Sequence, residues 1–300
     1  MRFIVFGAGA LGSLFGGILS RKNEVLLVGR HEHVKEINNN GLKISGMTEF
    51  VAHPEAVTNI EKHEDADLVI LTVKAYDTRS AVEEIADKCE CPILSIQNGI
   101  GNEEIISKIA GEDRTIGGIT THGVRYISPG NIIHTGKGET IIGEIDGSIS
   151  ERIREYEHAM TECGIETIVS KNIKAEIWRK AIVNASINPL TAVLKCKNGY
   201  LLENENARTL MEKICREGEK AAKSNGIEVG DVMKKVEEVA NMTRENHSSM
   251  LQSLMRGKRT EIEQINGELV RAGREKGIEM PANSFLVELV KAMENAAVAP

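Results

Sequence analysis

The sequence lacks an excess of positive charge, because 37 basic residues are outnumbered by 44 acidic ones and the net charge is −7. A protein that binds nucleic acid needs cations to neutralise phosphates, so this balance excludes that class of partner. Three cations do gather at residues 256–259. We interpret this short run as a solvated loop between two helices.

The sequence also lacks a long apolar run. Its first apolar stretch is interrupted by glycines and followed by Arg21 and Lys22, so it is too short and too polar to cross a bilayer. No charged leader with a small-residue cleavage site comes before the folded pattern, which begins at Arg2. We therefore expect a cytoplasmic protein with no membrane partner.

Cysteine is scarce and irregularly spaced. The nearest pair, Cys89 and Cys91, is too tight for a C-x-x-C metal or redox motif. We expect all the cysteines to be reduced thiols with no metal to bind, as is usual in the cytosol. They are Cys89, Cys91, Cys163, Cys196 and Cys215.

Length and composition are those of a globular protein with two domains. A chain of 300 residues exceeds what one hydrophobic core usually organises. Its 41% apolar and 27% charged residues are ordinary for folded domains. Because no repeat or low-complexity linker divides the chain, the boundary has to be placed by a change of pattern.

The first half alternates short apolar runs with helical stretches. This alternation is typical of β-α-β units, so it predicts an α/β domain with a doubly wound, mainly parallel sheet. The expected strands lie at residues 2–6, 24–28, 67–73, 92–96, 115–121, 131–134 and 140–143, with helices at 11–20 and 150–163.

The second half is almost entirely helical in pattern. Thr260 and Glu263 form a capping-box pattern, and Gly277 marks the end of the same helix. We place the domain boundary near residue 165 and expect an α/β domain over 1–165 and an all-α domain over 166–300. After a last strand at 166–169, helices are expected from 173 and at 203–225, 229–254, 260–276 and 283–295.

A glycine motif, G-x-G-x-x-G, stands where the first expected strand gives way to a helix. Gly7 permits a tight turn, Gly9 lets the backbone approach a pyrophosphate, and Gly12 allows the helix to pack closely on the sheet. The motif predicts a dinucleotide site at Gly7, Ala8, Gly9, Ala10, Leu11 and Gly12.

The residue after the second strand indicates which dinucleotide is bound. An NAD site usually has Asp or Glu there, whereas this chain has Arg30, which can pair with the 2′-phosphate of NADP(H). His31 beside it either assists or is an idle surface residue. Lys74 follows the third strand at the same edge, where we expect it to contact a phosphate or ribose.

Two polar clusters in the second half are candidates for chemistry. Lys180, Asn184 and Asn188 share one face of an otherwise apolar helix, so they bond either neighbouring helices or a ligand. Ser249 falls inside an expected helix, where serine has little intrinsic reason to be. Glu261 follows an expected N-cap and either binds a ligand or only complements the helix dipole.

With these motifs the sequence resembles the ketopantoate reductases (2-dehydropantoate 2-reductases), and the likeness follows the whole chain in order. The glycine motif is shared by many dehydrogenases, whereas the other motifs together are more specific. Gln97 is a departure, because some relatives have His there. The motifs lie at residues 7–12, 73–76, 97–99, 120–122, 178–180, 188–192, 198–199, 248–252, 260–262 and 265–267.

The resemblance implies a Rossmann domain followed by a helical domain of the 6-phosphogluconate dehydrogenase C-terminal-like type, with the active site in the cleft between them. It implies reduction of ketopantoate to (R)-pantoate by NADPH, in pantothenate and coenzyme A biosynthesis, and it hints at a homodimer. It makes Lys180 the general acid and a substrate contact. Its other substrate contacts fall on Asn98, Asn184, Asn188, Asn198 and Ser249, and its cofactor contacts on the glycine motif, Arg30, Lys74, Asn98, Val124 and Glu261.

Two other functions stay open. A related reductase would act on another branched 2-keto acid, because a cluster of asparagines accepts many carboxylates. A non-catalytic NADP-binding sensor would need no proton donor, so the presence of Lys180, Ser249 and Glu261 argues against it. In the reductase, the Lys180 ammonium stabilises the charge that forms on the ketone oxygen and then donates a proton.

Overall fold

The computed structural model describes residues 1–61 and 65–296, which fall into two compact units. The first contains Met1–Gln97 and Asn102–Ile173, and the second contains Asn98–Gly101 and the chain from Lys174 onward. The last strand of the first unit, Thr167–Val169, lies beyond the boundary expected at 165.

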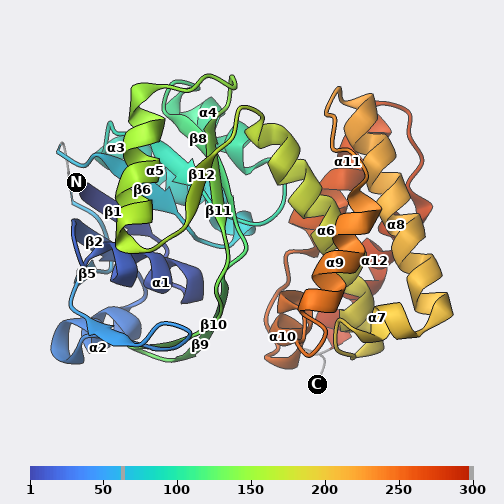
Figure 1. Ribbon diagram of the computed structural model, residues 1–300, viewed down its shortest axis with the longest axis horizontal. Coiled ribbons are helices and arrows are strands. Elements are labelled where there is room, and N and C mark those ends of the chain that lie inside the picture. Colours follow the sequence, from blue (N-terminus) through green and yellow to red (C-terminus); the bar gives the residue numbers. More distant parts are fainter. Residues whose placement is uncertain (62–64, 297–300) are drawn as a thin grey trace. The chain divides into compact units, whose positions relative to one another are not determined.

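The centre of the first unit is an eight-stranded sheet with the order β12-β11-β8-β7-β6-β1-β2-β5 (Figure 1). All neighbours run parallel except β11, which is antiparallel to β8. The expected mainly parallel α/β architecture is therefore confirmed. The strands are β1 (Arg2–Phe6), β2 (Glu24–Val28), β5 (Glu55–Val57), β6 (Leu68–Leu71), β7 (Ile93–Ser95), β8 (Thr115–Thr120), β11 (Thr140–Glu144) and β12 (Thr167–Val169).

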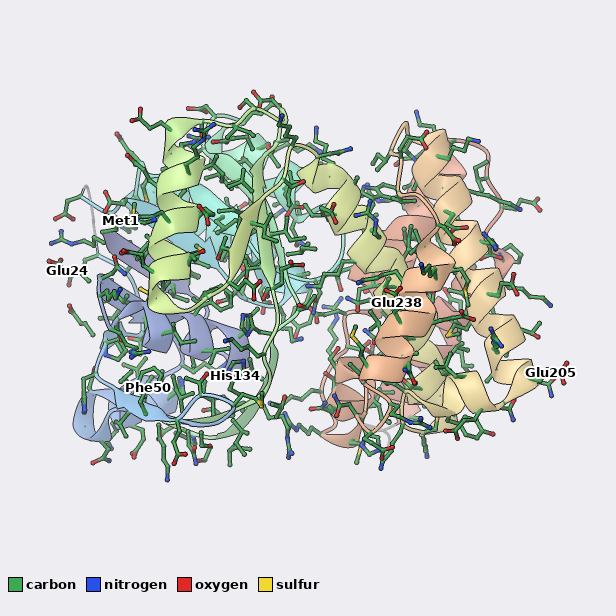
Figure 2. The ribbon with its side chains drawn as sticks, in the orientation of Figure 1. Met1, Glu24, Phe50, His134, Glu205 and Glu238 are labelled. Atoms are coloured by element: carbon green, nitrogen blue, oxygen red, sulfur yellow. The ribbon has the colours of Figure 1, made fainter. Side chains whose placement is uncertain are left out.

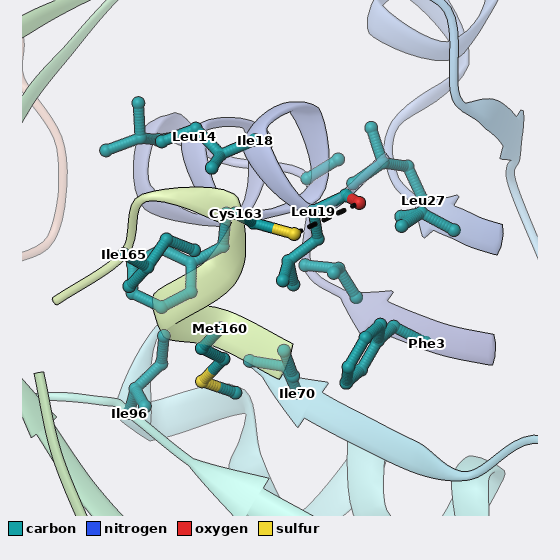
Figure 3. Packing of buried hydrophobic residues seen from close by; sticks show 14 of the residues in the cluster. Phe3, Leu14, Ile18, Leu19, Leu27, Ile70, Ile96, Met160, Cys163 and Ile165 are labelled. Carbon is teal, nitrogen blue, oxygen red and sulfur yellow. Dashed lines mark hydrogen bonds between the residues drawn. The ribbon is translucent and has the colours of Figure 1, made fainter. Parts of the chain in front are cut away.

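Helices cover this sheet and bury its apolar strands. Figure 3 shows how the end of α5 packs against α1 and the strands: Met160 and Cys163 lie among apolar side chains, and the Cys163 thiol is 3.9 Å from the carbonyl of Leu19. Such packing on a parallel sheet explains why the strands read as unbroken apolar runs. The helices are α1 (Ala10–Leu19), α2 (His31–Asn40), η1 (Ala75–Asp77), α3 (Thr78–Lys88), α4 (Asn102–Ala110) and α5 (Glu151–Cys163).

A second, four-stranded sheet with the order β4-β3-β10-β9 belongs to the same unit, and the sequence did not predict it. Leu42, Ile44 and Ile132 join its buried face to the core around α1. Figure 2 labels Phe50 on β4 and His134 on β10. The strand expected at 131–134 exists, but it lies in this sheet. The strands are β3 (Leu42–Gly46), β4 (Phe50–Ala52), β9 (Gly123–Ser128) and β10 (Asn131–Gly136).

The second unit is helical, as expected. Among the described residues, no helix is long and apolar enough to span a membrane. The long helix α6 carries Lys180, Asn184 and Asn188. The helices are α6 (Ile173–Leu194), α7 (Tyr200–Glu203), α8 (Glu205–Ser224), α9 (Val232–Met242), α10 (Ser249–Met255), the π-helical turn η2 (Glu263–Gly267), α11 (Glu268–Glu275) and α12 (Pro281–Ala296).

The single helix expected at 229–254 is wrong, because the chain breaks between α9 and α10. In the break, the carbonyls of Arg244 and Asn246 accept hydrogen bonds from the backbone N–H groups of Gly199 and Asn198, at 3.1 and 3.0 Å. Carbonyls bound to another segment do not continue a helix. Ser249 is therefore the first residue of α10 rather than an interior one.

The capping box expected at Thr260 and Glu263 is also wrong. The Thr260 hydroxyl accepts from the N–H of Ile262 at 3.2 Å, and the Thr260 N–H donates to Glu294 at 2.6 Å. Glu263 instead accepts from Lys291 at 2.8 Å. Glu294 on α12 thus takes the role expected of Glu263, and the helical segment opens with the π-helical turn η2.

Candidate active site

Two positions in the glycine turn after β1 tolerate no residue other than glycine. Gly7 has a φ of +111°, and a Cβ there would lie 2.6 Å from the backbone nitrogen of Val73. A Cβ on Gly12 would lie 2.3 Å from the Gly7 carbonyl oxygen. Both contacts are too short, so the turn and the start of α1 require these two glycines.

Gly9 is different, because nothing but the Gly7 carbonyl, at 3.9 Å, would meet a Cβ there. It is the N-cap of α1, and no side chain caps the helix from this position. The open surface and the backbone N–H groups of the first turn fit the pyrophosphate of a dinucleotide. The expected cofactor motif therefore has the local geometry that such a ligand requires.

Two cationic side chains follow the strands next to β1. Arg30 comes after β2 and Lys74 shortly after β6, and both strands pair in parallel with β1. The carboxyl ends of parallel neighbours lie at one edge of a sheet, so the structure brings the glycine turn, Arg30 and Lys74 to the same edge. Both cationic side chains are exposed, as a contact with a ligand phosphate would need.

The buried His33 holds α1, the helix that follows the glycine turn, by hydrogen bonds. His33 Nδ1 accepts from the N–H of Gly130 at 2.9 Å, so its Nε2 carries the proton and donates to the hydroxyl of Ser13 on α1, at 2.8 Å. Burial lowers the pKa of His33 and keeps it neutral. The Tyr126 hydroxyl lies 3.2 Å from the same Nδ1, and burial raises the pKa of Tyr126 against the opposing charge of Arg30.

Two further histidines fix the start of β9, where Val124 lies. The Thr48 hydroxyl is 2.8 Å from His134 Nδ1, and His134 Nε2 is 3.0 Å from His122 Nδ1. Burial, followed by the charges of His134 and Lys137, lowers the pKa of His122 to about 4. The chain of neutral rings therefore holds the backbone beside Val124 without adding charge.

In the second unit, α6 presents the expected polar face. Lys180 and Asn184 are half-buried and Asn188 is buried. The rest of the helix is largely apolar and buried around Ala181, Ile182 and Ala185. An ammonium and two amides on one face of such a helix are groups that can hydrogen-bond a ligand.

Ser248 joins α6 to the start of α10. Its hydroxyl oxygen accepts from the Leu251 N–H at 3.2 Å and from the Thr191 hydroxyl at 2.8 Å, and it lies 3.3 Å from the Asn188 carbonyl, to which it donates. This arrangement fixes Ser249, an exposed residue, beside the carboxyl-terminal part of the α6 face. The sequence singled out Ser249, whereas the hydrogen bonds that join α10 to α6 are made by Ser248.

Asn198 has one hydrogen-bonding atom to spare. Its Nδ2 donates to the Thr243 hydroxyl at 2.9 Å. Its Oδ1 is buried and has no hydrogen-bond partner among residues 1–61 and 65–296. A buried acceptor without a donor is costly, so this atom suits a ligand that brings an O–H or N–H group.

The segment Asn98–Gly101 belongs to the second unit and packs against η2. The Ile100 N–H donates to the Gln264 carbonyl at 3.2 Å. Gly99 has a φ of +91°, and a Cβ there would lie 2.3 Å from the same carbonyl oxygen. Asn98 adjoins these two residues and is thus held near the turn η2. This turn follows Glu261, a carboxylate only 7% exposed.

The structure groups the expected residues into two sets, one in each unit. It also shows supporting residues that sequence reasoning missed, above all His33, Thr191 and Ser248. Ser248 and Thr191 carried a signal, as members of the motifs at 248–252 and 188–192, whereas His33 carried none. The described residues contain no group of side chains suited to a metal ion. The first set is Gly7, Ala8, Gly9, Ala10, Leu11, Gly12, Arg30, Lys74 and Val124, and the second is Asn98, Lys180, Asn184, Asn188, Asn198, Ser249 and Glu261.

Comparison with known structures relates this fold to reductases of 2-keto acids. A ketopantoate reductase of the PanE/ApbA family from Ralstonia eutropha matches with a TM-score of 0.93 and 29% identity over 100% of both chains. A D-mandelate dehydrogenase, solved with NADH and anilino(oxo)acetate, matches equally well, with a TM-score of 0.93 and 29% identity over 100% of both chains.

Sequence comparison is more specific. The 2-dehydropantoate 2-reductases of Pyrococcus horikoshii and Pyrococcus abyssi are 41% and 42% identical to this chain, and each match covers 98% of both chains. The family model "Ketopantoate reductase PanE/ApbA" matches residues 3–147, and "Ketopantoate reductase PanE/ApbA C terminal" matches residues 172–294. The two models and the relatives together cover both units, and the chain belongs to the ketopantoate reductase family.

Proposed function

We propose that this protein reduces 2-dehydropantoate to (R)-pantoate with NADPH, as a step in pantothenate and coenzyme A biosynthesis. The first unit binds the cofactor and the second binds the substrate. Identity above 40% to relatives named 2-dehydropantoate 2-reductase supports this substrate. A reductase of this kind has a small-molecule substrate and no nucleic-acid or membrane partner.

The cofactor set supports NADPH as the reductant. The open backbone at Gly9 takes the pyrophosphate, Arg30 pairs with the 2′-phosphate, and Lys74 contacts a phosphate or ribose. Val124, Asn98 and Glu261 complete the set as further contacts. When bound, NADPH supplies the hydride that reduces the C2 ketone.

The α6 face supports acid catalysis by Lys180. Its ammonium hydrogen-bonds the ketone oxygen, stabilises the negative charge that develops there, and donates the proton that completes the hydroxyl group. Asn184 and Asn188 stand one and two turns further along the same face, so neutral donors line the path of the substrate. A second cation there would compete with Lys180 for the carboxylate.

The remaining contacts hold the substrate from its other groups. Ser249 and the amide of Asn188 hydrogen-bond the carboxylate. One amide hydrogen of Asn198 is bonded to Thr243, and its buried Oδ1 has no partner among the described residues, so Oδ1 accepts from the substrate hydroxyl. This assignment separates Asn198 from the residues that bind the carboxylate.

The observation that carries the proposal is the polar face of α6 in a chain that belongs to this family. The test is a steady-state assay of the full chain with a panel of 2-keto acids, each with NADPH and with NADH. We expect the highest kcat/KM for 2-dehydropantoate with NADPH. A higher value for another branched 2-keto acid would reassign the substrate, and NADPH binding without turnover of any keto acid would indicate a sensor.

A second candidate is reduction of an aryl 2-keto acid. It is favoured by the likeness to D-mandelate dehydrogenase, which equals the likeness to the Ralstonia ketopantoate reductase. Phenylglyoxylate in the panel tests it directly. Faster turnover of phenylglyoxylate with NADH than of 2-dehydropantoate with NADPH would establish this second candidate.

A further inference from the structure

Helix α6 contains a proline in its interior, one residue after Asn188. Pro189 has no N–H group, so the carbonyl of Ala185 in the preceding turn loses its usual helical donor. A proline ring inside a helix also crowds that carbonyl, and such crowding bends helices. The buried Ala185 carbonyl therefore needs a donor from elsewhere.

Asn266 supplies that donor from a different part of the chain. Its Nδ2 lies 3.2 Å from the Ala185 carbonyl oxygen and 2.9 Å from Oδ1 of Asn283 on α12. Asn266 is fully buried. Both hydrogens of one amide group are thus committed, one to α6 and one to α12.

The orientation of the Asn266 amide follows from its neighbours. Asn283 uses its own Nδ2 on the Glu217 carboxylate, at 2.8 Å, so its Oδ1 can only accept. If the Asn266 amide were turned over, its oxygen would face two acceptors, the Ala185 carbonyl and Asn283 Oδ1. The donor therefore points at Ala185.

The π-helical turn η2 places Asn266 where it can reach α6. A π turn inserts an extra residue and shifts the side chains that follow it, and such turns are frequent at functional sites. The same turn contains Gln264, whose carbonyl holds the segment that begins with Asn98. One turn thus holds both α6 and the Asn98 segment.

The position of Pro189 relates the bend to the polar face. Pro189 follows Lys180 by nine residues, which at about 100° per residue puts it on the opposite side of α6. A helix bends away from its proline, so a bend at Pro189 is one that makes the Lys180 side concave. Lys180 and Asn184 precede the bend, and Asn188 lies at it.

We propose that Asn266 is a positioning residue, whose amide replaces the donor that Pro189 withholds from Ala185 and so fixes Lys180 and Asn184 relative to Asn188. The inference rests on the proposed function of this face and extends it to a residue that does not touch substrate. It predicts that Asn266 and Pro189 are energetically coupled. Loss of the amide matters because the proline is there.

The test is a double-mutant cycle in the full chain, with Asn266→Leu and Pro189→Ala. Asn266→Leu keeps the size of the side chain and removes both donors. We expect it to lower kcat/KM for 2-dehydropantoate by about tenfold or more, since small displacements of catalytic groups are costly. Pro189→Ala restores a backbone N–H to α6, so in that background the effect of Asn266→Leu shrinks to about twofold or less.

A matched control comes from a half-buried amide in the same unit. Asn225 donates to the carbonyls of Ala221 and Ala272, at 2.8 and 3.2 Å, and does not touch α6. Asn225→Leu lowers the melting temperature but changes kcat/KM by no more than about twofold, and by the same factor with or without Pro189→Ala. An equal loss for Asn266→Leu in both backgrounds, or no loss in the folded single variant, overturns the proposal.

Melting temperatures of the same four proteins separate this proposal from the proposed function. Coupling between Asn266→Leu and Pro189→Ala in melting temperature does not depend on any substrate. If the wild-type chain fails to reduce 2-dehydropantoate, the proposed function fails but the coupling still decides whether Asn266 supports α6. If Asn266→Leu does not fold, Asn266→Ser is measured in both backgrounds, and additive losses again overturn the proposal.

Discussion

The three glycines of the cofactor turn are alike in sequence but differ in what surrounds them. A Cβ on Gly12 would meet the Gly7 carbonyl at 2.3 Å and the Thr72 hydroxyl at 2.5 Å, whereas one on Gly9 would meet almost nothing. We expect Gly12→Ala to cost about 2 kcal/mol or more of stability. Gly9→Ala leaves stability within about 1 kcal/mol but weakens NADPH binding, because its methyl group lies on the open surface.

Melting temperatures and NADPH titrations by fluorescence measure both effects of the glycine substitutions. Gly164 is a matched control for volume, since a Cβ there meets nothing, although its φ of +98° adds strain. Unchanged NADPH affinity in a folded Gly9→Ala variant would show that the pyrophosphate does not bind at Gly9.

Arg30 is the residue from which the choice of cofactor follows. Arg30→Asp replaces a cation by an anion that repels a 2′-phosphate and can accept from ribose hydroxyls. We expect the Kd for NADPH to rise by about 100-fold or more, and the Kd for NADH to change far less. Arg79→Asp, at an exposed position on α3 near Glu83, serves as the control for charge. Equal losses for both cofactors would show that Arg30 does not read the phosphate.

Lys180 is the residue whose loss should stop turnover without unfolding the protein. Lys180→Ala removes the proposed acid, and we expect kcat to fall by about 100-fold or more while NADPH still binds. Lys197→Ala provides the control, because Lys197 is an exposed lysine of the same unit that pairs with Glu245 at 2.7 Å. Near-normal kcat in a folded Lys180→Ala protein would reject its role as acid.

At the scale of elements, periodicity predicted most helices and every strand of the main sheet except β5, a three-residue strand at its edge. The small sheet was missed because strands such as β9 are partly exposed and so lack a continuous apolar pattern. The break at 243–248 was missed because its cause is a distant one: Asn198 and Gly199 take the carbonyls that a helix would use. Local patterns do not contain such long-range competition.

A substitution of Ser248 tests whether the contact between α10 and α6 supports the proposed substrate site. It caps α10 and ties that helix to Asn188 and Thr191. We expect Ser248→Ala to lower stability by about 1 kcal/mol and to raise KM for the keto acid, since Ser249 and Asn188 lose their common anchor. Ser253→Ala on the same helix, which loses only a bond to the Ser249 carbonyl, is the control. A KM equal to that of the control would leave Ser248 with a capping role alone.

The candidate site could be foreseen only in part. The glycine motif and the face of α6 follow from spacing within one element, and the sequence named their members. His33 under the glycine turn gave no such signal, and Asn266 stood in the motif at 265–267 with nothing to show that it binds α6. Their roles depend on which elements meet, and that is set by the packing of the whole unit.

At the scale of the whole molecule, the two units differ in their histidines. His33, His122 and His134 all belong to the first unit, and burial lowers the pKa of each, that of His122 to about 4. In the second unit, the shifted carboxyls are Glu245 and Glu263, whose lysine and arginine partners lower their pKa values below 4.5. The two units should therefore respond to acid in different pH ranges.

The sign of the effect follows from proton uptake. Between about pH 6.5 and pH 4 His122 binds a proton in the unfolded chain but not in the folded one, so unfolding takes up a proton and stability falls as the pH falls. The lowered pKa values of His33 and His134 act in the same direction. The first unit therefore has its full free energy of unfolding above about pH 6.5. It loses part of this free energy as the pH falls toward the pKa of the folded histidines. We expect the first unit to lose on the order of 1 to 3 kcal/mol between pH 7 and pH 4.5.

The single tryptophan makes this difference measurable in the full chain, because Trp178 lies on α6 in the second unit. Urea unfolding followed by Trp178 fluorescence reports the second unit, while loss of NADPH binding reports mainly the first, because the glycine turn, Arg30 and Lys74 supply most of the proposed cofactor contacts. At pH 7 the two curves lie close together, and at pH 5 the midpoint for NADPH binding moves to lower urea by more than the fluorescence midpoint. His122→Asn, which has no titrating ring, reduces the separation. Parallel movement of both curves, with no effect of His122→Asn, would place the acid sensitivity outside the buried histidines.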